Sequence, residues 1–340
     1  MIRIRPLLAR LAVGAITAST ATACASAPPY TDERPEVREF ISTMTSKHAF
    51  TADELKTVFR EVNYRQDIID AMTKPAEKRP WSEYRPRFLT PDRIRGGVEF
   101  WKENEEILAR AEQTYGVPPQ IVTAIIGVET FYGRSTGRHR VVDALATLAF
   151  DYPPRADFFR GELEQYLMLT REEHFDPLTL TGSYAGAMGK PQFIPSSYRR
   201  YAVDFDGDGR RDLFNNVADV IGSVANYLGT QGWKKDEAVV APATVTSEDY
   251  LALLALGIEP RTPVSELPAR GVLAGETLAP ETPVALIELD GEKGKEYWVG
   301  LRNFYVITRY NRSSLYAMAV TQLAQEIAAQ YRAPIKAKAP

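Results

Sequence analysis

The sequence has one cysteine, three histidines and no excess of basic residues, and each shortage excludes a class of protein. The single cysteine, Cys24, cannot form an internal disulfide bond. The histidines, His48, His139 and His174, lie too far apart in the chain for the usual spacing of zinc ligands. The formal net charge is −3 over 340 residues, whereas nucleic-acid-binding domains usually carry a strong basic excess. Nucleic acid is therefore not an expected partner.

Motifs for serine hydrolysis and nucleotide binding are missing as well. The chain has no G-x-S-x-G nucleophile elbow and no phosphate-binding loop, since Gly207 and Gly209 lack the third glycine of the dinucleotide motif. No stretch of about 18 or more apolar residues follows residue 23, so no transmembrane helix is predicted. What remains is a globular composition, 44% hydrophobic and 25% charged, in a chain long enough for about two or three domains.

The first 23 residues predict an export signal. They contain three arginines and no acid, then a short apolar segment over residues 11–16, then small residues up to Ala23. Cys24 follows directly, and Ala21-Thr22-Ala23-Cys24 resembles the cleavage box of bacterial lipoproteins, although Ala21 stands where Leu or Val is usual. We predict acylation of Cys24 and a tether over residues 24–35. The alternative is cleavage at an ordinary signal-peptidase site.

Apolar periodicity predicts a mainly helical protein. Helical patterns cover residues 36–71, 91–115, 118–130, 141–150, 156–170, 195–202, 219–229 and 303–329. Residues 73–91 are rich in proline, arginine and aromatic residues and are expected to form an extended loop. Residues 182–192 are expected to form a glycine-rich loop.

Residues 239–301 differ in character and predict a small β unit. Short β-type runs are followed by a strand at 285–289, a turn at 291–294 and a strand at 296–301. The predicted fold class is α+β, mainly α, with a small antiparallel β domain inserted into a helical protein. The expected boundaries are an N-terminal helical region at 36–115, a core at 116–236, the β insert at 237–302, the C-terminal part of the core at 303–332 and a tail at 333–340.

Glu129 lies at the end of an otherwise apolar helical segment. Residues four apart share a helix face, so Ile121, Ile125 and Glu129 should lie in one row. Burial among apolar neighbours raises the pKa of a carboxyl group, and an acid that stays protonated near neutral pH can donate a proton to a leaving group. The alternative is an ordinary ion pair between Glu129 and Arg134 or Arg138.

The loop over residues 182–198 combines small residues, polar tips and aromatic rings. Its glycines allow a ligand to approach the backbone closely. Ser183 and Gln192 can hydrogen-bond to hydroxyl or acetamido groups, and Tyr184 and Phe193 offer flat apolar faces. A tight loop between domains has the same composition, so both interpretations stay open on composition alone.

Together these segments resemble the B-type family of membrane-bound lytic murein transglycosylases. The resemblance runs from about Trp81 to the C-terminal helix and rests on many matches in the same order. The matching segments are Gly127-Val128-Glu129-Thr130 and residues 117–119, 143–148, 161–164, 183–198, 221–227 and 303–311.

The resemblance implies a fold and an activity. The family has a lysozyme-like helical core with an added helical domain and a small β domain. Its enzymes cut the β-1,4 bond between N-acetylmuramic acid and N-acetylglucosamine in peptidoglycan. Glu129 is thereby expected to protonate the glycosidic oxygen and then to take a proton from the muramyl C6 hydroxyl. The product is a 1,6-anhydro sugar, with the 2-acetamido group assisting the first step.

Two rival functions stay open. A hydrolysing muramidase needs a second carboxylate about 5–10 Å from the first; Asp143, Asp151 and Glu162 are available, with surface or ion-pair roles as their alternative. A non-catalytic peptidoglycan-binding protein could keep the same groove. Glu129 argues against that second rival, since a binding protein needs no shielded acid.

Six residues match the substrate groove of the family and are expected to contact or line the sugar: Ser183, Gln192, Tyr84, Tyr310, Asn311 and Tyr316. Core packing of the last helix is the alternative for Tyr310 and Tyr316. Lys190-Pro191 stands where an aromatic-Gly pair is common in relatives. This departure affects the expected loop shape beside Gln192, but not the chemistry.

Residues 204–210 resemble the start of an EF-hand loop. Aspartates occupy positions one, three and five, and glycine occupies position six. The twelfth residue is Asn215 instead of Glu, and the resemblance supplies a later residue as the last ligand. The predicted ligands are Asp204, Asp206, Asp208, the backbone carbonyl of Arg210, and Asp219. We predict a structural Ca²⁺; Na⁺, Mg²⁺ or a metal-free turn loop are the alternatives.

The resemblance also implies a location and partners. The expected location is the bacterial cell envelope, in the periplasm, as an outer-membrane lipoprotein if Cys24 is acylated. The expected substrate is the glycan strand of peptidoglycan, and proteins of cell-wall synthesis or division are expected partners.

Overall fold

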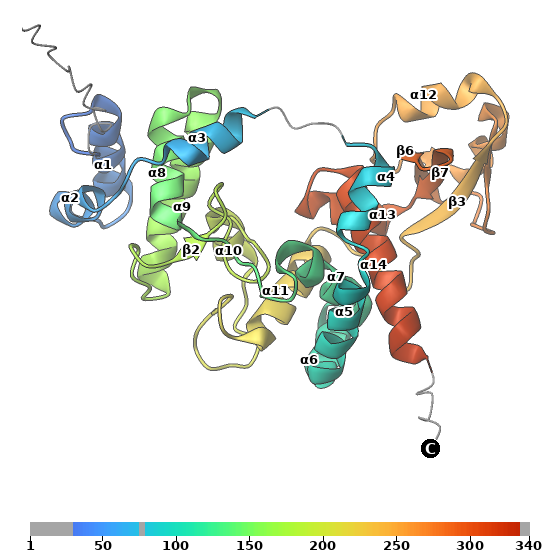
Figure 1. The fold of residues 1–340 in the computed structure, drawn as a ribbon, viewed down its shortest axis with the longest axis horizontal. Helices are drawn as coiled ribbons and strands as arrows, with labels where there is room; N and C mark the ends of the chain where they lie inside the picture. Colours follow the sequence, from blue (N-terminus) through green and yellow to red (C-terminus); the bar gives the residue numbers. More distant parts are fainter. Residues whose placement is uncertain (1–29, 75–78, 334–340) are drawn as a thin grey trace, which may run out of the picture.

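The computed structural model describes residues 30–74 and 79–333, and its fold is mainly α with a small antiparallel β unit, as predicted (Figure 1). The expected export signal and Cys24 lie outside the described residues. Helices α1 and α2 lie at one end of the long axis, and strands β3, β6 and β7 lie at the other. Within the described ranges, no helix combines the length and the apolar character needed to cross a membrane.

The N-terminal half of the chain is helical. Its helices are α1 (Pro35–Lys47), α2 (Ala52–Arg60), α3 (Gln66–Thr73), α4 (Trp81–Tyr84), α5 (Pro91–Glu103), α6 (Glu105–Tyr115), α7 (Pro119–Thr130), α8 (Val141–Asp151) and α9 (Ala156–Glu172). Local sequence explains several starts. Thr51 and Glu54 form a reciprocal capping box at α2. A two-stranded sheet of β1 (His139–Arg140) and β2 (Thr181–Gly182) joins the start of α8 to the glycine-rich loop.

The second half adds further helices and a five-stranded sheet. The helices are α10 (Pro195–Tyr201), α11 (Val217–Thr230), α12 (Leu251–Leu254), α13 (Arg302–Tyr310) and α14 (Ser314–Arg332). The strands are β3 (Val240–Val245), β4 (Thr262–Pro263), β5 (Val272–Ala274), β6 (Pro283–Gly291) and β7 (Gly294–Gly300). Their order is β4-β6-β7-β3-β5, and all neighbours are antiparallel. Strands β6 and β7 form the predicted hairpin, closed where Gly291 pairs with Gly294.

Two predicted helices are each broken into two. Residues 91–115 form α5 and α6, because the Asn104 side chain donates a hydrogen bond to the Phe100 carbonyl (2.8 Å) and ends α5. Residues 303–329 form α13 and α14, because the Ser313 hydroxyl accepts from the Tyr316 amide (3.3 Å) and starts a new helix. In both places a short polar side chain satisfies the backbone better than a continued helix does.

The expected extended loop at 73–91 is also wrong in part. Residues 81–87 form α4 and a 3₁₀ turn, η1 (Arg85–Arg87). Pro80 supplies an extended N-cap, and the Trp81 side chain is fully buried, so burial of one large ring outweighs a composition typical of loops. This short helix carries Tyr84 to the core.

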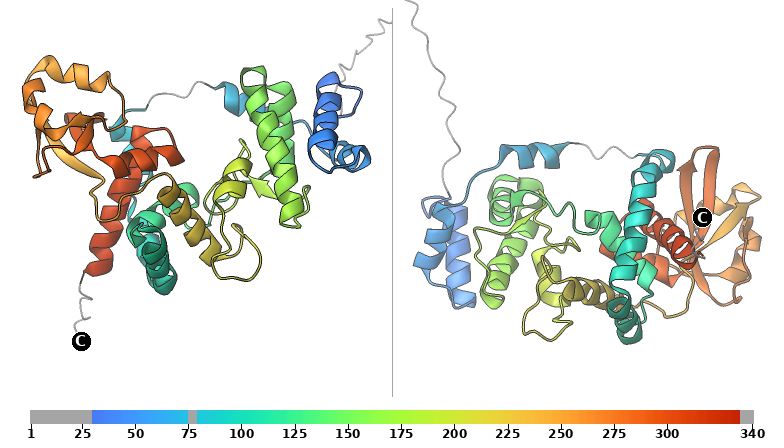
Figure 2. Two further views of the ribbon diagram at one scale, coloured as in Figure 1. Left: turned by 180° about the vertical axis from the view of Figure 1, so that it is seen from behind. Right: turned by 60° about the horizontal axis from the view of Figure 1, so that its bottom comes forward.

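Helix α7 is the centre of the fold. It begins at Pro119, a residue suited to the first helical turn. All of its residues except Gln120 and Glu129 are buried. Helices α5, α6, α11 and α14 pack against it, and α14 runs beside α5 (Figure 2). Glu129 is therefore the one acidic side chain of an enclosed helix, one residue before its end.

Candidate active site

The Glu129 carboxyl group lies in an aromatic environment with no cation nearby. Its Oε1 accepts a hydrogen bond from the Tyr316 hydroxyl at 2.6 Å. Within the described ranges no Lys, Arg or His nitrogen lies within 4.0 Å of it, and the Arg134 guanidinium instead lies over the Phe131 ring, 4.8 Å from its centre. Burial raises the pKa of Glu129 to about 7, and the hydrogen bond from Tyr316 opposes part of that rise. The alternative of an ion pair to an arginine is not observed.

Three predicted tyrosines come together around this acid from separate helices. Tyr316 on α14 is buried and contacts it directly. Tyr310, at the end of α13, stacks almost parallel to Tyr316, with ring centres 6.4 Å apart. Tyr84 on α4 lies close enough that burial first, and then the Glu129 charge, raises the pKa of its hydroxyl. The three rings lie near the carboxyl group, while Glu129 itself stays partly exposed.

The glycine-rich loop is joined to the acid-bearing helix through backbone atoms of Lys190 and Pro191. The Thr130 hydroxyl donates to the Lys190 carbonyl (2.8 Å), and the Tyr310 hydroxyl donates to the Pro191 carbonyl (2.5 Å). The Lys190 amide donates to the Leu213 carbonyl (2.9 Å). The residue pair that departs from the family pattern is thus the junction between the acid, Tyr310 and the next loop.

The remaining predicted sugar contacts have mixed roles. The Ser183 hydroxyl accepts from the amides of Ala185 and Ala187, which fixes the tip of its loop. The Gln192 side-chain amide nitrogen donates to the carbonyls of Thr136 and Gly189, and its backbone φ is 52°. Asn311 is exposed, directly after Tyr310.

Other acids suggested as a second catalytic carboxylate have structural partners. Asp143 forms an ion pair with Arg140 at 2.8 Å. Asp151 pairs with Arg34 at 3.0 Å. Glu162 accepts hydrogen bonds from the Ser196 amide and hydroxyl at 2.9 and 2.7 Å. Each carboxylate therefore has a partner that its removal would leave unsatisfied.

An unusual backbone conformation follows directly after the acid. Phe131, Tyr132 and Gly133 all have positive φ, at 52°, 61° and 87°. Two consecutive non-glycine residues in the left-handed region cost free energy and persist only where the surroundings hold them. Sequence reasoning did not single out this turn, because Phe131 and Tyr132 carry none of the usual marks of a left-handed position.

Tyr132 is held by glycines of two helices. Its hydroxyl donates to the Arg93 carbonyl at 2.7 Å. A Cβ at Gly127 would lie 2.6 Å from the Tyr132 hydroxyl, and a Cβ at Gly97 would also lie 2.6 Å from it. The ring therefore occupies space that only glycine leaves free, and it fixes the end of α7 that carries Glu129. The glycines at 97 and 127 were the available sequence signal.

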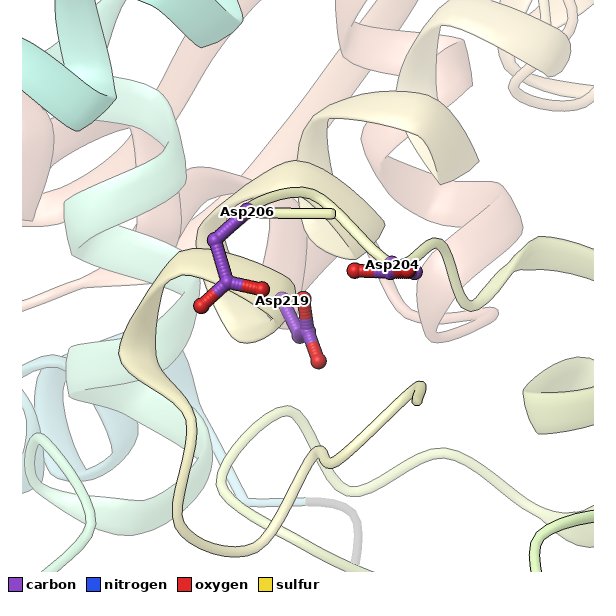
Figure 3. A group of neighbouring side chains, drawn as sticks. All are labelled: Asp204, Asp206 and Asp219. Carbon is purple, nitrogen blue, oxygen red and sulfur yellow. The ribbon is translucent and has the colours of Figure 1, made fainter. Parts of the chain in front are cut away.

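The predicted metal loop brings three of its aspartates together. Oxygen atoms of Asp204, Asp206 and Asp219 lie within 4.8 Å of one another, and Figure 3 shows the three carboxylates gathered around one space. Asp219 is buried, and burial, opposed by its amide hydrogen bonds, raises its pKa with help from the charges of Asp206 and Asp204. Asp208 does not join this group; its Oδ1 accepts from the amide of Arg210 (2.9 Å). Three close carboxylates with hard oxygen donors fit a divalent cation such as Ca²⁺.

Calcium is expected to stabilise the protein through these aspartates. At a Ca²⁺ concentration about 100 times Kd, binding to the folded state alone adds about 3 kcal/mol to the free energy of unfolding. Thermal unfolding with Ca²⁺ and with a chelator measures this difference. Asp219→Asn should remove it, whereas Asp290→Asn in the β6–β7 hairpin should leave it intact. An identical melting temperature with and without Ca²⁺ would contradict the metal site.

Comparisons with known proteins identify the family of this chain. The family model described as "Transglycosylase SLT domain" matches residues 32–325. Membrane-bound lytic murein transglycosylase B of Escherichia coli K12 is 45% identical over 304 residues, which cover 86% of this chain and 83% of that protein. The crystal structure of soluble lytic transglycosylase SltB1 from Pseudomonas aeruginosa is 54% identical with a TM-score of 0.84, covering 88% of this chain and 100% of that one.

Two further similar structures contain ligands. Escherichia coli lytic transglycosylase Slt35 in complex with calcium is 44% identical with a TM-score of 0.79, covering 87% of this chain and 94% of that one. Pseudomonas aeruginosa SltB3 in complex with NAG-NAM-pentapeptide is 30% identical with a TM-score of 0.79, covering 90% of this chain and 83% of that one. The fold and the matches define a peptidoglycan lytic transglycosylase, a lyase. The chain belongs to the family of the transglycosylase SLT domain.

Proposed function

We propose that this enzyme cuts the β-1,4 bond between N-acetylmuramic acid and N-acetylglucosamine without water, with Glu129 as its single acid and base. The observation that carries the proposal is a carboxylic acid, held by Tyr316, whose pKa burial raises to about 7. Such a group is protonated in part at neutral pH, so it can donate a proton as an acid and accept one as a base. The partners of Asp143, Asp151 and Glu162 support a mechanism with one carboxylate.

The steps balance without a second catalytic group. Glu129 gives its proton to the glycosidic oxygen, and the bond between that oxygen and the muramyl C1 breaks, with the 2-acetamido group stabilising the positive charge that develops. The Glu129 carboxylate then takes the proton of the C6 hydroxyl, whose oxygen bonds to C1. The hydrogen bond from Tyr316 keeps the carboxylate in place between the two steps. The product is a 1,6-anhydro sugar.

The substrate is proposed to lie against the three tyrosines and the glycine-rich loop. Tyr84, Tyr310 and Tyr316 offer flat faces with polar tips beside the acid. Ser183, Gln192 and Asn311 add polar groups at the loop and at the end of α13. The calcium complex of Slt35 supports a structural Ca²⁺ at Asp204, Asp206 and Asp219. The ion takes no part in the proton transfers.

The location proposed is the bacterial cell envelope. The similarity to a membrane-bound murein transglycosylase supports it. A lipid anchor at Cys24 in the outer membrane, periplasmic exposure, and contacts with proteins of cell-wall synthesis or division remain parts of the same proposal. Labelling with a radioactive fatty acid, in the natural chain and in Cys24→Ala, tests the anchor.

Mass spectrometry of muropeptides released from purified peptidoglycan tests the chemistry. Anhydro products are expected, lighter than hydrolytic products by one water molecule. Full-mass reducing products would make the enzyme a muramidase and require a second carboxylate. Retained binding of glycan strands without any release would identify a peptidoglycan-binding protein instead.

Activity is expected to fall as the pH rises through about 7, because only the protonated Glu129 can donate. In Tyr316→Phe the hydrogen bond that favours the ionised carboxylate is lost, so the pKa of Glu129 rises and the fall in kcat/KM moves to higher pH. Initial rates across the neutral range measure both effects. Tyr305→Phe, the same change on the neighbouring helix α13, should leave the profile unaltered. Superimposable profiles for Tyr316→Phe and the natural enzyme would refute the role given to Tyr316.

A further inference from the structure

A cavity lies outside the group of tyrosines, between the β unit and the helices. It has a volume of about 540 Å³ and is lined by α4 and η1, by the turn of the β6–β7 hairpin and by α14. Figure 1 shows α4 between the strands of the β unit and the central helices. Nothing in the proposed chemistry uses this space.

Charges of both signs line the cavity, and most have no ion-pair partner. The charged residues are Arg85, Glu292, Lys293, Lys295, Glu296 and Glu326. Lys295 pairs with Glu288 and Asp290, and Arg85 donates to the neutral side chain of Gln322 (2.7 Å). Within the described ranges the other four form no ion pair closer than 4.0 Å. Free acids and free bases facing one space are suited to a ligand that carries both charges.

Helix α4 contributes residues both to this cavity and to the surroundings of the acid. Tyr84 lies on the side of Glu129, whereas Trp81, Ser82 and Arg85 line the cavity. Helix α14 also has residues in both places. Tyr316 contacts Glu129, whereas Gln322 and Glu326, further along the helix, line the cavity. Six to ten residues of helix correspond to roughly 9–15 Å at 1.5 Å per residue. The cavity therefore lies about two to three helical turns along α14 from the residue that binds Glu129.

We propose that this cavity binds the peptide stem of the glycan strand that is being cut. Muramic acid carries the stem covalently, and a five-residue stem extends to about 17 Å, which matches the distance along α14. The stem has several carboxylates and, in diamino-acid stems, an ammonium group, so it offers partners for Arg85 and Lys293 and for the free glutamates. SltB3 in complex with NAG-NAM-pentapeptide is a related enzyme with such a ligand. The proposal rests on the proposed function, since the sugar must lie at Glu129.

The test compares two substrates with one pair of variants. Purified peptidoglycan strands with their stems, and the same strands stripped of stems by an amidase, are cut by the natural enzyme and by Lys293→Ala/Glu326→Ala. We expect KM of the variant to rise about tenfold on strands with stems, from the loss of charge-assisted hydrogen bonds. On stripped strands the variant should match the natural enzyme. Lys102→Ala/Glu103→Ala, an exposed pair on α5 with the same change in charge, is the control.

The other outcomes contradict either the stem site or the proposed function, and the two can be told apart. An unchanged KM on both substrates, or an equal loss on both, overturns the stem site. If the natural enzyme releases no anhydro product from either substrate, the proposed function fails separately. Binding of the stem in the cavity is then tested directly, by calorimetric titration of the free stem pentapeptide into the natural protein and into Lys293→Ala/Glu326→Ala. Equal binding, or none, overturns it, and weaker binding to the variant supports it.

Discussion

Glu129→Gln is expected to release no detectable anhydro-muropeptides, with kcat reduced at least about 1,000-fold. An amide cannot donate a proton to the glycosidic oxygen or accept one from the C6 hydroxyl, and general acid–base catalysis contributes roughly 100- to 10,000-fold for each role. Glycan binding should survive, because the amide keeps the shape of the side chain and can still accept from Tyr316. Release of muropeptides and binding of glycan strands are measured on the same preparation.

The same variant should be more stable than the natural enzyme at alkaline pH. Burial raises the pKa of Glu129 from 4.5 to about 7, so the folded state binds more protons than the unfolded state between these values. The natural protein therefore loses stability as the pH rises through that window, by roughly 3 kcal/mol in total, and glutamine has no such titration. Thermal unfolding above and below the window measures the difference.

Glu162→Gln is the matched control for both measurements. It changes another buried carboxylate, one that Ser196 binds with both its amide and its hydroxyl. Activity per folded molecule should stay close to that of the natural enzyme. If Glu162→Gln abolished activity while the protein stayed folded, a mechanism with a single carboxylate would be wrong.

Gly127→Ala is expected to destabilise the protein by about 2 kcal/mol and to reduce kcat further than the loss of folded protein explains. A Cβ at this position would lie 2.6 Å from the Tyr132 hydroxyl and 2.7 Å from its Cζ, so the ring must move. Overpacking of this kind typically costs about 1–3 kcal/mol. Movement of Tyr132 breaks its bond to Arg93 and releases the left-handed turn directly after Glu129. Melting temperature and kcat at a temperature where both proteins are folded measure the two effects.

Gly161→Ala provides the comparison. Gly161 also lies within a helix, α9, but a Cβ there would meet nothing within 4 Å. Alanine at an open helical position should stabilise the protein slightly, by about 0.5–1 kcal/mol. Equal behaviour of Gly127→Ala and Gly161→Ala would show that Tyr132 does not depend on the glycine.

The parts that local sequence determines could be predicted. The apolar run of α7 with one acid near its end predicted both the helix and the raised pKa of Glu129, and alternation with turn residues predicted the β6–β7 hairpin. Resemblance to the family added Tyr84, Tyr310 and Tyr316, which come from distant parts of the chain. No periodicity brings such residues together.

The parts that depend on contacts across the fold could not be predicted. The break at Asn104 and the short helix at Trp81 are decided by one side-chain hydrogen bond and by one buried ring. The packing of Tyr132 on Gly97 and Gly127 is visible only once α5 and α7 lie side by side. The position of the Asp208 carboxylate, which accepts from the Arg210 amide and lies outside the group of three aspartates, also depends on the local turn and not on the spacing of the motif.

The junction at Lys190 and Pro191 has a consequence for how the enzyme can be altered. Its contacts to Thr130, Tyr310 and Leu213 use only backbone carbonyls and an amide, so the side chains at these positions take no part in them. A substitution that keeps the backbone conformation at these two positions is therefore expected to keep the three contacts. For the experimenter, position 190 is a poor place to attach a bulky probe, because the Lys190 side chain lies against Gly133 in the left-handed turn directly after the acid; a Cβ on Gly133 would lie 3.0 Å from the Lys190 Cε.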